Sequence, residues 1–490
     1  MAGLMIQGTS SDAGKSILVA GLCRVFKRKG FSVAPFKPQN MALNSAVTLD
    51  GGEIGRAQAL QAAACGLELH TDFNPVLLKP SSDMNSQVII NGKAVSQLAA
   101  KEFGNIKALA FQSVLEAYRR LTDQYDLVII EGAGSPAEVN LRNNDIANMG
   151  FAEEVDCPVI LVSDIDRGGV FAHLTGTLNI LSKTEQQRIK GFVINKFRGH
   201  LKLLQGGLDW LEENTRKPVI GVLPFIQDLK LDAEDAVPRQ TSTSQGLVNI
   251  KVIVLPRISN HTDFEPLSAN PKINFEFVRE AEQLVGADLV IIPGSKNVRD
   301  DLDFILSNGW KDAIEKHCRY GGKLLGICGG FQMLGERVDD LDGIESTAGT
   351  TNGLGLFSMT TELKQQKDLK RVSGEYDFAG EKGRLTGYEI HCGQTTGKSL
   401  KQPFCHLQDQ HGNRYADGAI SDDQQIIGTY LHGLFENKYL TESVLFWASG
   451  KQITGYDWQE VRENELERLA DVLEEHLDLT KILQIVKPSN

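Results

Sequence analysis

The sequence of 490 residues has little of what marks secreted, membrane or metal-stapled proteins. Its seven cysteines are scattered, odd in number and without a CxxC pair, which favours a reducing cytoplasm over a disulfide framework or a structural zinc site. No apolar run approaches membrane-spanning length, and the N-terminus runs into a glycine loop too soon for a signal peptide. Internal repeats and low-complexity segments are also lacking. We therefore expect a cytoplasmic globular protein.

Long basic runs are missing as well. The net charge is −12, so neither nucleic acid nor an anionic membrane surface is an expected partner. The composition, 41% hydrophobic and 23% charged, is ordinary for a globular protein. The chain is longer than one core usually serves, so two or three domains are expected.

Short apolar runs alternate with helical patterns, which is typical of α/β domains with parallel sheets. The expected strands of the first series cover residues 4–7, 32–35, 127–130, 159–162, 191–194 and 219–222. Those of the second series cover residues 250–255, 288–292, 323–327 and 425–430. We predict two doubly wound α/β domains at residues 1–232 and 249–445.

A polar stretch with several glycine and serine residues separates the two series, and we interpret 233–248 as the linker. Residues 446–490 form a predicted helical tail. Apolar residues recur there at helical spacing with acids between them, namely Leu466, Leu469, Val472, Leu473 and Leu477. This pattern indicates an amphipathic helix that packs on the body of the protein.

The first expected strand leads into a glycine loop that ends in Gly-Lys-Ser. Backbone N–H groups of such a loop can wrap phosphates, Lys15 can reach the terminal phosphates, and Ser16 can ligate Mg²⁺. Five residues separate the loop glycines, whereas the commonest P-loop has four. The candidate nucleotide-binding residues are Gly8, Thr9, Asp12, Ala13, Gly14, Lys15 and Ser16. The loop resembles that of dethiobiotin synthetase and its relatives, which implies a domain that uses ATP to activate a carboxylate.

Other polar residues follow the strands of the first domain. Glu131 ends a strand and is placed to hold the metal, although a solvated strand-end acid is the plainer interpretation. Asp50 is a weaker metal candidate that a turn aspartate explains nearly as well. Asn195 is a candidate for reading the base, and Arg198 stands where a guanine-specific site usually has Asp, which favours ATP over GTP.

Two further loops are weak candidates for substrate binding. The segment KPQNMALNS offers Lys37, Asn40 and Asn44, which suit a ligand rich in carboxylates and amides. The segment SDIDRGG offers Asp164 and Arg167 at the same sheet edge, where a salt-bridged loop is an equally good interpretation.

The second domain carries a thiol at the apex of an expected strand, turn and helix. The run KLLGICGGFQMLG places Cys328 after an apolar strand and before two glycines. A turn of this kind aims backbone N–H groups and a helix N-terminus at the side chain, which favours a thiolate and an oxyanion. A buried structural cysteine is the alternative.

A thiol nucleophile needs a base and an oxyanion hole. His432 lies just past a strand and is the candidate base, and His391 is a second histidine that we also regard as a weak substrate-binding candidate. The N–H groups of Gly329 and of Gly294 or Ser295 are candidates for the oxyanion hole.

This constellation resembles the class I glutamine amidotransferases. The resemblance implies that Cys328 is the nucleophile and His432 the base. Most members of that class place Glu two residues after the histidine, where this sequence has Leu434. We therefore expect a Cys–His pair without the usual carboxylate to orient the ring.

Taken in order, several segments resemble the cobyric acid synthase family of cobalamin biosynthesis. They are GTSSDAGKS, KPQNMALNS, EGAGSPAEVNL, SDIDRGGVFA, PGSKN, GICGGFQMLG, GYEIHCGQT and TYLHGLF. The resemblance implies glutamine-dependent amidation of the b, d, e and g carboxylates of adenosylcobyrinic acid a,c-diamide, with ATP and Mg²⁺. Ammonia from glutamine would meet an acyl phosphate near Lys15.

Two other functions stay open from the sequence. Cobyrinic acid a,c-diamide synthase shares the expected architecture and acts on other carboxylates of the corrinoid. A P-loop switch ATPase with an inert amidotransferase-like binding domain is an alternative of a different class, and steady glutamine hydrolysis would exclude it.

Overall fold

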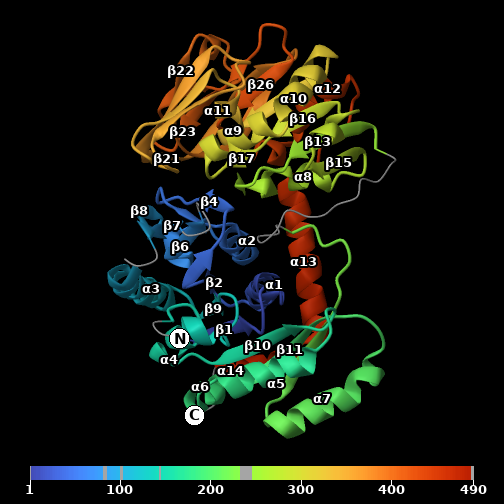
Figure 1. Ribbon diagram of the computed structural model, residues 1–490. Coiled ribbons are helices and arrows are strands. Elements are labelled where there is room, and N and C mark those ends of the chain that lie inside the picture. Colours follow the sequence, from blue (N-terminus) through green and yellow to red (C-terminus); the bar gives the residue numbers. More distant parts are fainter. Residues whose placement is uncertain (1, 81–84, 100–102, 143–144, 232–245, 487–490) are drawn as a thin grey trace.

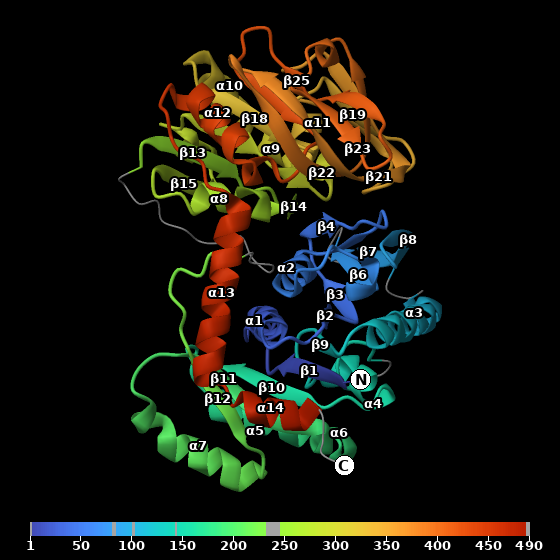
Figure 2. The same ribbon diagram turned by 180° about the vertical axis from the view of Figure 1, so that it is seen from behind.

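The computed structural model describes residues 2–80, 85–99, 103–142, 145–231 and 246–486. Two α/β bodies are stacked end to end, and one long helix runs between them (Figures 1 and 2). The predicted fold class is confirmed. The linker expected at 233–248 lies mostly outside the described residues. Within the described part of the chain, no helix is both long enough and apolar enough to span a membrane.

The N-terminal body is built on a six-stranded sheet whose order is β12-β11-β10-β1-β9-β2. All its pairings are parallel. The strands are β1 Ala2–Gly8, β2 Val33–Phe36, β9 Leu127–Glu131, β10 Val159–Asp164, β11 Ile189–Phe197 and β12 Val219–Pro224. Each of the six predicted strands is confirmed. They are apolar almost throughout because helices cover both faces of the sheet.

Two cores lie on the two faces of this sheet. Helices on one face are α1 Lys15–Arg28 and α2 Arg56–Cys65. Helices on the other face are α3 Phe103–Gln124, α4 Met149–Glu154, α5 Val170–Ile180 and α7 Leu201–Thr215, and the short α6 Lys183–Arg188 precedes β11. The sheet's carboxyl edge carries the glycine loop, Glu131 and Asp164, as expected for ligand sites in parallel sheets.

Two small sheets lie between the two bodies, and the sequence did not predict them (Figure 1). One has the order β3-β6-β7-β8 and the other pairs β4 with β5. Their strands are β3 Gln39–Met41, β4 Ser45–Val47, β5 Glu53–Gly55, β6 Val76–Pro80, β7 Asn85–Ile90 and β8 Lys93–Ala99. The segment expected to be a polar loop, 37–45, therefore includes parts of two strands.

The C-terminal body has a sheet with the order β15-β13-β16-β18-β26-β25. Its strands are β13 Val248–Ile253, β15 Ile273–Val278, β16 Leu289–Ile292, β18 Lys323–Ile327, β25 Ala419–Ile420 and β26 Ile426–Thr429. The pairings are parallel except for the short edge strand β25. Helices α8 Glu265–Ser268, α9 Val298–Ser307, α10 Trp310–Arg319 and α11 Gly329–Met333 accompany the sheet.

A second, largely antiparallel sheet flanks the first and was also missed by the sequence. It contains β19 Arg337–Asp340, β20 Gly349–Asn352, β21 Met359–Phe378, β22 Glu381–Gly397, β23 Cys405–Asp409 and β24 Arg414–Asp417. The long hairpin of β21 and β22 carries His391. A two-residue pair, β14 Ile258–Ser259 with β17 Gly294–Ser295, lies beside the thiol turn.

The chain ends in α12 Lys438–Ser449, α13 Trp458–His476 and α14 Leu479–Val486. The boundary expected at residue 445 falls inside α12. Helix α13 leaves the C-terminal body and packs on α1 of the N-terminal body (Figure 2). The backbone after it joins β12, because Asp478 N–H donates to the carbonyl of Ile220 at 2.9 Å.

Candidate active site

The loop between β1 and α1 bends tightly around Gly14. Gly14 has a φ of +92°, and a Cβ there would lie 2.1 Å from Nδ2 of Asn195, so both conformation and space require glycine. Nδ2 of Asn195 donates to the carbonyl of Ala13 at 3.0 Å. Lys15 donates to two backbone carbonyls at 3.0 and 3.1 Å. The amide that the sequence assigned to reading the base is thus engaged on the loop backbone.

Glu131 is the centre of a buried polar cluster beside this loop. Its carboxylate accepts hydrogen bonds from Ser16 Oγ at 2.8 Å and Lys37 Nζ at 2.9 Å, and a third from Gln61. Burial raises the pKa of Glu131, but Lys37 and the three hydrogen bonds hold it below its usual value. The carboxylate is therefore ionised, and the structure brings together Ser16, Glu131 and Lys37.

An Mg²⁺ ion fits this cluster on the chemistry of its donors. Ser16 offers a hydroxyl and Glu131 a carboxylate, which are oxygen ligands of the kind that Mg²⁺ binds together with substrate phosphates. Within the described residues, no three His, Cys, Asp or Glu side chains could hold a metal ion by themselves. An ion here would depend on phosphate oxygens for the rest of its shell.

Asp50 is placed elsewhere. It lies in the turn between β4 and β5, where it accepts a hydrogen bond from Thr71. Among the described residues, no hydrogen bond joins Asp50 to Ser16 or Glu131. Asn40, a substrate candidate, donates to Oε1 of Gln58 at 3.0 Å.

Ion pairs tie the rim of the nucleotide loop together. Arg167 lies 3.1 Å from Asp12, and Lys196 donates to Asp164 at 2.9 Å. Oγ1 of Thr9 lies 2.8 Å from another strand-end hydroxyl, that of Ser163. The predicted residues Thr9, Asp12, Asp164 and Arg167 therefore meet at one edge, in the salt-bridged arrangement that was the alternative interpretation.

The thiol turn has the strained geometry of a nucleophile elbow. Cys328 lies between β18 and α11 with a φ of +52°, which is unusual for a residue other than glycine. A Cβ on Gly330 would lie 2.0 Å from the carbonyl oxygen of Ile292, so only glycine fits there. Strain of this kind is held only where the surroundings fix it, and it is common at active sites.

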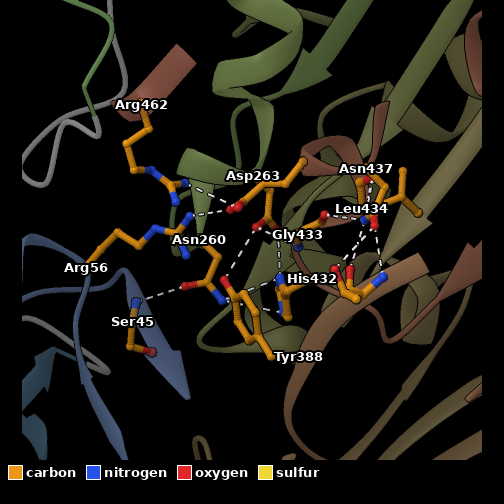
Figure 3. Close-up of polar contacts among 12 residues, drawn as sticks. Ser45, Arg56, Asn260, Asp263, Tyr388, His432, Gly433, Leu434, Asn437 and Arg462 are labelled. Atoms are coloured by element: carbon orange, nitrogen blue, oxygen red, sulfur yellow. Dashed lines mark hydrogen bonds and ion pairs between the residues drawn. The ribbon is translucent and has the colours of Figure 1, made fainter. Parts of the chain in front are cut away.

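His432 is held by an acid that the sequence analysis missed. Its Nδ1 lies 2.6 Å from Oδ2 of Asp263, and its ring stacks on Tyr388 at 5.3 Å between centroids. The other Asp263 oxygen accepts a hydrogen bond from Gly433 N–H at 3.3 Å. Figure 3 shows Asp263, Tyr388 and His432 converging from three separate segments. The carboxylate absent from position 434 is thus supplied from elsewhere in the fold.

The charge state of His432 follows from this contact. Burial lowers its pKa, but the charge and hydrogen bond of Asp263, together with a hydrogen bond to Cys328, raise it to about 10. His432 is therefore an imidazolium near neutral pH and interacts with the Cys328 thiol, whose Sγ donates to the carbonyl of Ile390 at 3.4 Å. A histidine beside a thiol is the arrangement of a Cys–His nucleophile pair.

The backbone groups proposed for the oxyanion hole lie beside this pair. A Cβ on Gly329 would lie 2.9 Å from the amide nitrogen of Ser295, and one on Gly294 would lie 3.6 Å from Cε1 of His432. The structure therefore brings Cys328 and His432 together with all three predicted backbone residues.

His391 lies on β22 and lines the cavity that also contains Cys328. Burial lowers its pKa to about 4, so it is neutral, and its ring stacks on Tyr430 at 3.8 Å.

Comparison with known proteins finds a match for each half of the chain. A family model of the CobQ/CobB/MinD/ParA nucleotide binding domain matches residues 4–238, and one of the CobB/CobQ-like glutamine amidotransferase domain matches residues 249–440. A cobyric acid synthase of Shewanella oneidensis is 54% identical, and the match covers 99% of each chain. The chain belongs to the cobyric acid synthase family. It is an enzyme, a ligase that contains a glutamine amidotransferase domain.

Solved structures are more distant from this member of the cobyric acid synthase family. A chain of PurLQS from Thermotoga maritima is 16% identical, with a TM-score of 0.30 over 45% of this chain and 99% of its own. A glutamine amidotransferase structure is 15% identical, with a TM-score of 0.31 over 41% of this chain and 99% of its own. At these identities and TM-scores, neither structure gives information about the site.

The two halves of this family member clasp each other next to His432. Oδ1 of Asn44 accepts from His261 N–H at 3.1 Å, and Oδ1 of Asn260 accepts from Ser45 N–H at 3.1 Å. Nδ2 of Asn260 lies 3.5 Å from each ring nitrogen of His432 (Figure 3). Asn44, predicted to bind substrate, thus contacts the glutaminase half.

A second set of polar contacts crosses the interface farther out. Glu436 lies 2.6 Å from Arg56 of the N-terminal half and 3.2 Å from Arg462 of α13. Arg371 pairs with Glu68 at 2.7 Å on the surface. Two of these ion pairs, Arg56 with Glu436 and Arg371 with Glu68, join the two bodies at further points of the interface.

Proposed function

We propose that this protein makes adenosylcobyric acid by amidating the b, d, e and g carboxylates of adenosylcobyrinic acid a,c-diamide. ATP activates each carboxylate as an acyl phosphate, and ammonia released from glutamine at Cys328 displaces the phosphate. The observation that supports this most is the presence of two chemical sites in one chain. One is a phosphate loop with Lys15, Ser16 and Glu131, and the other is a thiol paired with His432 and Asp263.

The thiol half releases ammonia in two steps. The Cys328 thiolate attacks the glutamine amide carbon, and backbone N–H groups at Gly329 and Ser295 receive the negative oxygen. The His432 imidazolium gives its proton to the leaving nitrogen, so that NH₃ departs and a thioester remains. Neutral His432 then takes a proton from water, which attacks the thioester and frees glutamate. Asp263 keeps the ring in one orientation throughout.

The nucleotide half makes the carboxylate electrophilic. Lys15 and the loop N–H groups bind and orient the phosphates, and transfer of the γ-phosphoryl group to a carboxylate oxygen gives the acyl phosphate and ADP. An Mg²⁺ ion held by Ser16 and Glu131 would neutralise phosphate charge. Attack by NH₃ then forms the amide and releases phosphate, which balances each cycle.

Mass spectrometry of the corrinoid product tests this proposal. The protein should convert cobyrinic acid a,c-diamide with ATP, Mg²⁺ and glutamine, giving one amidation step for each of the four carboxylates. Cys328→Ala should lose amidation from glutamine and keep amidation from added ammonia. Lys15→Ala should lose both.

Each contrary outcome has a meaning. Glutamine-driven amidation by Cys328→Ala would overturn the nucleophile. Failure to amidate the a,c-diamide, together with amidation of unmodified cobyrinic acid at its a and c positions, would identify the other corrinoid synthase. Glutamine hydrolysis without any amidation of a corrinoid would leave the amidotransferase half and reject the substrate.

A further inference from the structure

The cavity beside Cys328 is lined by both halves of the chain. From the C-terminal half it is lined by Cys328, Gly329, Lys296 and Lys367 among others, and from the N-terminal half by Lys79 and Gln87. Lys79 belongs to β6 and Gln87 to β7, in the small sheet that lies between the two bodies (Figure 1). The wall of the thiol cavity is therefore a domain interface.

Three lysine side chains, Lys79, Lys296 and Lys367, line this cavity. Lys79 and Lys367 both donate to the carboxylate of Glu53, and Lys79 also donates to Ser45 Oγ at 2.6 Å. Burial raises the pKa of Glu53, but Lys367, Lys79 and Lys296 together lower it by more than burial raises it. Glu53 is therefore ionised. One carboxylate thus serves two of the three lysines, and burial lowers the pKa of Lys79 well below its usual value.

Lys296 is the cation left over. Among the described residues, none forms a hydrogen bond or an ion pair with its ammonium group. Burial lowers its pKa, as does Lys367. The other carboxyl of the cavity, Glu345, has its pKa raised to about 7 by burial, so it is about half ionised near neutral pH. Lys296 is half-buried, and a partly desolvated cation without a partner carries a cost that an anionic ligand would relieve.

We propose that Lys296 binds the α-carboxylate of glutamine and that Lys79, from the N-terminal half, completes this subsite together with Lys367. The inference rests on the proposed hydrolysis of glutamine at Cys328. Three carbon atoms separate the attacked amide carbon of glutamine from its α-carboxylate, and the thiol and the lysines line one cavity.

The subsite has a consequence for how the halves cooperate. Because Lys79 is supplied by the N-terminal half, the glutamine site is complete only when both halves are docked. Lys79 is held in place by Ser45 and Glu53, which lie in the small sheet of β4 and β5. Glutamine is then bound at full strength only in the orientation that can pass ammonia to the other half.

A substrate pair tests the carboxylate subsite directly. We expect the unmodified protein to prefer glutamine over glutamine α-amide, which lacks the carboxylate, by about 10- to 100-fold in kcat/KM, as for a hydrogen bond to a charged group. In Lys296→Met this preference should largely vanish, since the variant loses only what the carboxylate contributes. Lys79→Met should reduce the preference as well.

Lys364→Met is the matched control. Lys364 lies on β21 like Lys367, but it is half-exposed, pairs with Glu362 and does not line the cavity, so its loss should leave the preference unchanged.

Three outcomes distinguish a failure of the carboxylate subsite from a failure of the proposed function. Equal use of both substrates by the unmodified protein would overturn the subsite without any variant. An equal fall in kcat/KM for both substrates in Lys296→Met would also overturn the subsite. Absence of glutamine hydrolysis in the unmodified protein would instead overturn the proposed function.

Discussion

The carboxylate that orients His432 comes from a part of the chain far from where class I amidotransferases usually carry it. Position 434 is a leucine buried in the core. The carboxylate beside the ring is that of Asp263, which lies 169 residues before His432. The folded pKa of His432, about 10, exceeds its ordinary value near 6.5. The pair therefore stabilises the fold fully below about pH 6.5, and this contribution is lost as the pH rises through about 10.

Asp263→Asn should lower the kcat of glutamine hydrolysis by about 10²-fold, the scale of one acid–base group. It should also move the alkaline limb of the pH profile downward, because the main charge that raises the pKa of His432 is removed. The measurement is kcat against pH, with thermal unfolding as a check on folding. A lower kcat with an unmoved alkaline limb would assign Asp263 a purely structural part.

At the scale of elements, α13 joins the nucleotide-binding body although it follows the glutaminase domain in the chain. Its buried face meets α1, where Leu469 lies so close to Gly21 that a Cβ there would come within 3.0 Å of its Cγ. On the helix surface, Arg24 and Arg28 both pair with Glu467. The helix is thus a strap that completes a core already formed by the first strands and helices.

Leu469→Ala should destabilise the N-terminal body by about 2–5 kcal/mol, since it empties a fully buried leucine site. Urea unfolding followed by circular dichroism measures this as a lower midpoint of the first transition. Asn464→Ala, on the exposed face of the same helix, should change stability by less than about 0.5 kcal/mol. Equal effects of the two variants would show that α13 does not belong to this core.

At the scale of the whole molecule, the clasp of Asn44 and Asn260 links the nucleotide half to His432. Lys37 contacts Glu131 beside the nucleotide loop, and Asn44 follows it at the end of the same segment. Asn44 binds the backbone of His261, two residues before Asp263. The geometry of His432 therefore depends on how the two halves are docked.

Asn44→Ala should lower the kcat of glutamine hydrolysis by about 3- to 10-fold, the effect of one lost buried hydrogen bond, and leave its KM unchanged. Glu68→Ala removes the exposed ion pair with Arg371 across the same interface and should change neither constant. Steady-state kinetics on both variants give the comparison. If Asn44→Ala also loses amidation from added ammonia, Asn44 serves the corrinoid site, as its sequence first suggested.

The local sites were predictable because each is carried by a short segment. A glycine loop after an apolar strand, and a thiol followed by two glycines, are specified by neighbouring residues whose backbone geometry leaves few choices. The two small sheets and the long hairpin of β21 and β22 were not predicted. Their strands are short or polar, as in the QNM of β3 and the KQQKD run of β21. Hydrophobic periodicity therefore could not reveal them as strands.

Asp263 escaped prediction for a different reason. The run Ser259–Asp263 reads as a polar surface turn, yet all five residues are buried because the other half and Tyr388 cover them. A short polar run after a strand near a proline is common, and nothing local distinguishes one that enters an active site.

The sequence by itself determined the parallel sheets, the phosphate loop, the thiol elbow and the family, since these depend on local patterning and short-range backbone geometry. Only the tertiary structure decided which acid orients His432, which body α13 completes, and that Lys79 reaches the cavity of Cys328. Each of these is a contact between segments far apart in the chain, and hydrogen bonds and ion pairs of that kind are set by docking and leave no periodic trace in the sequence.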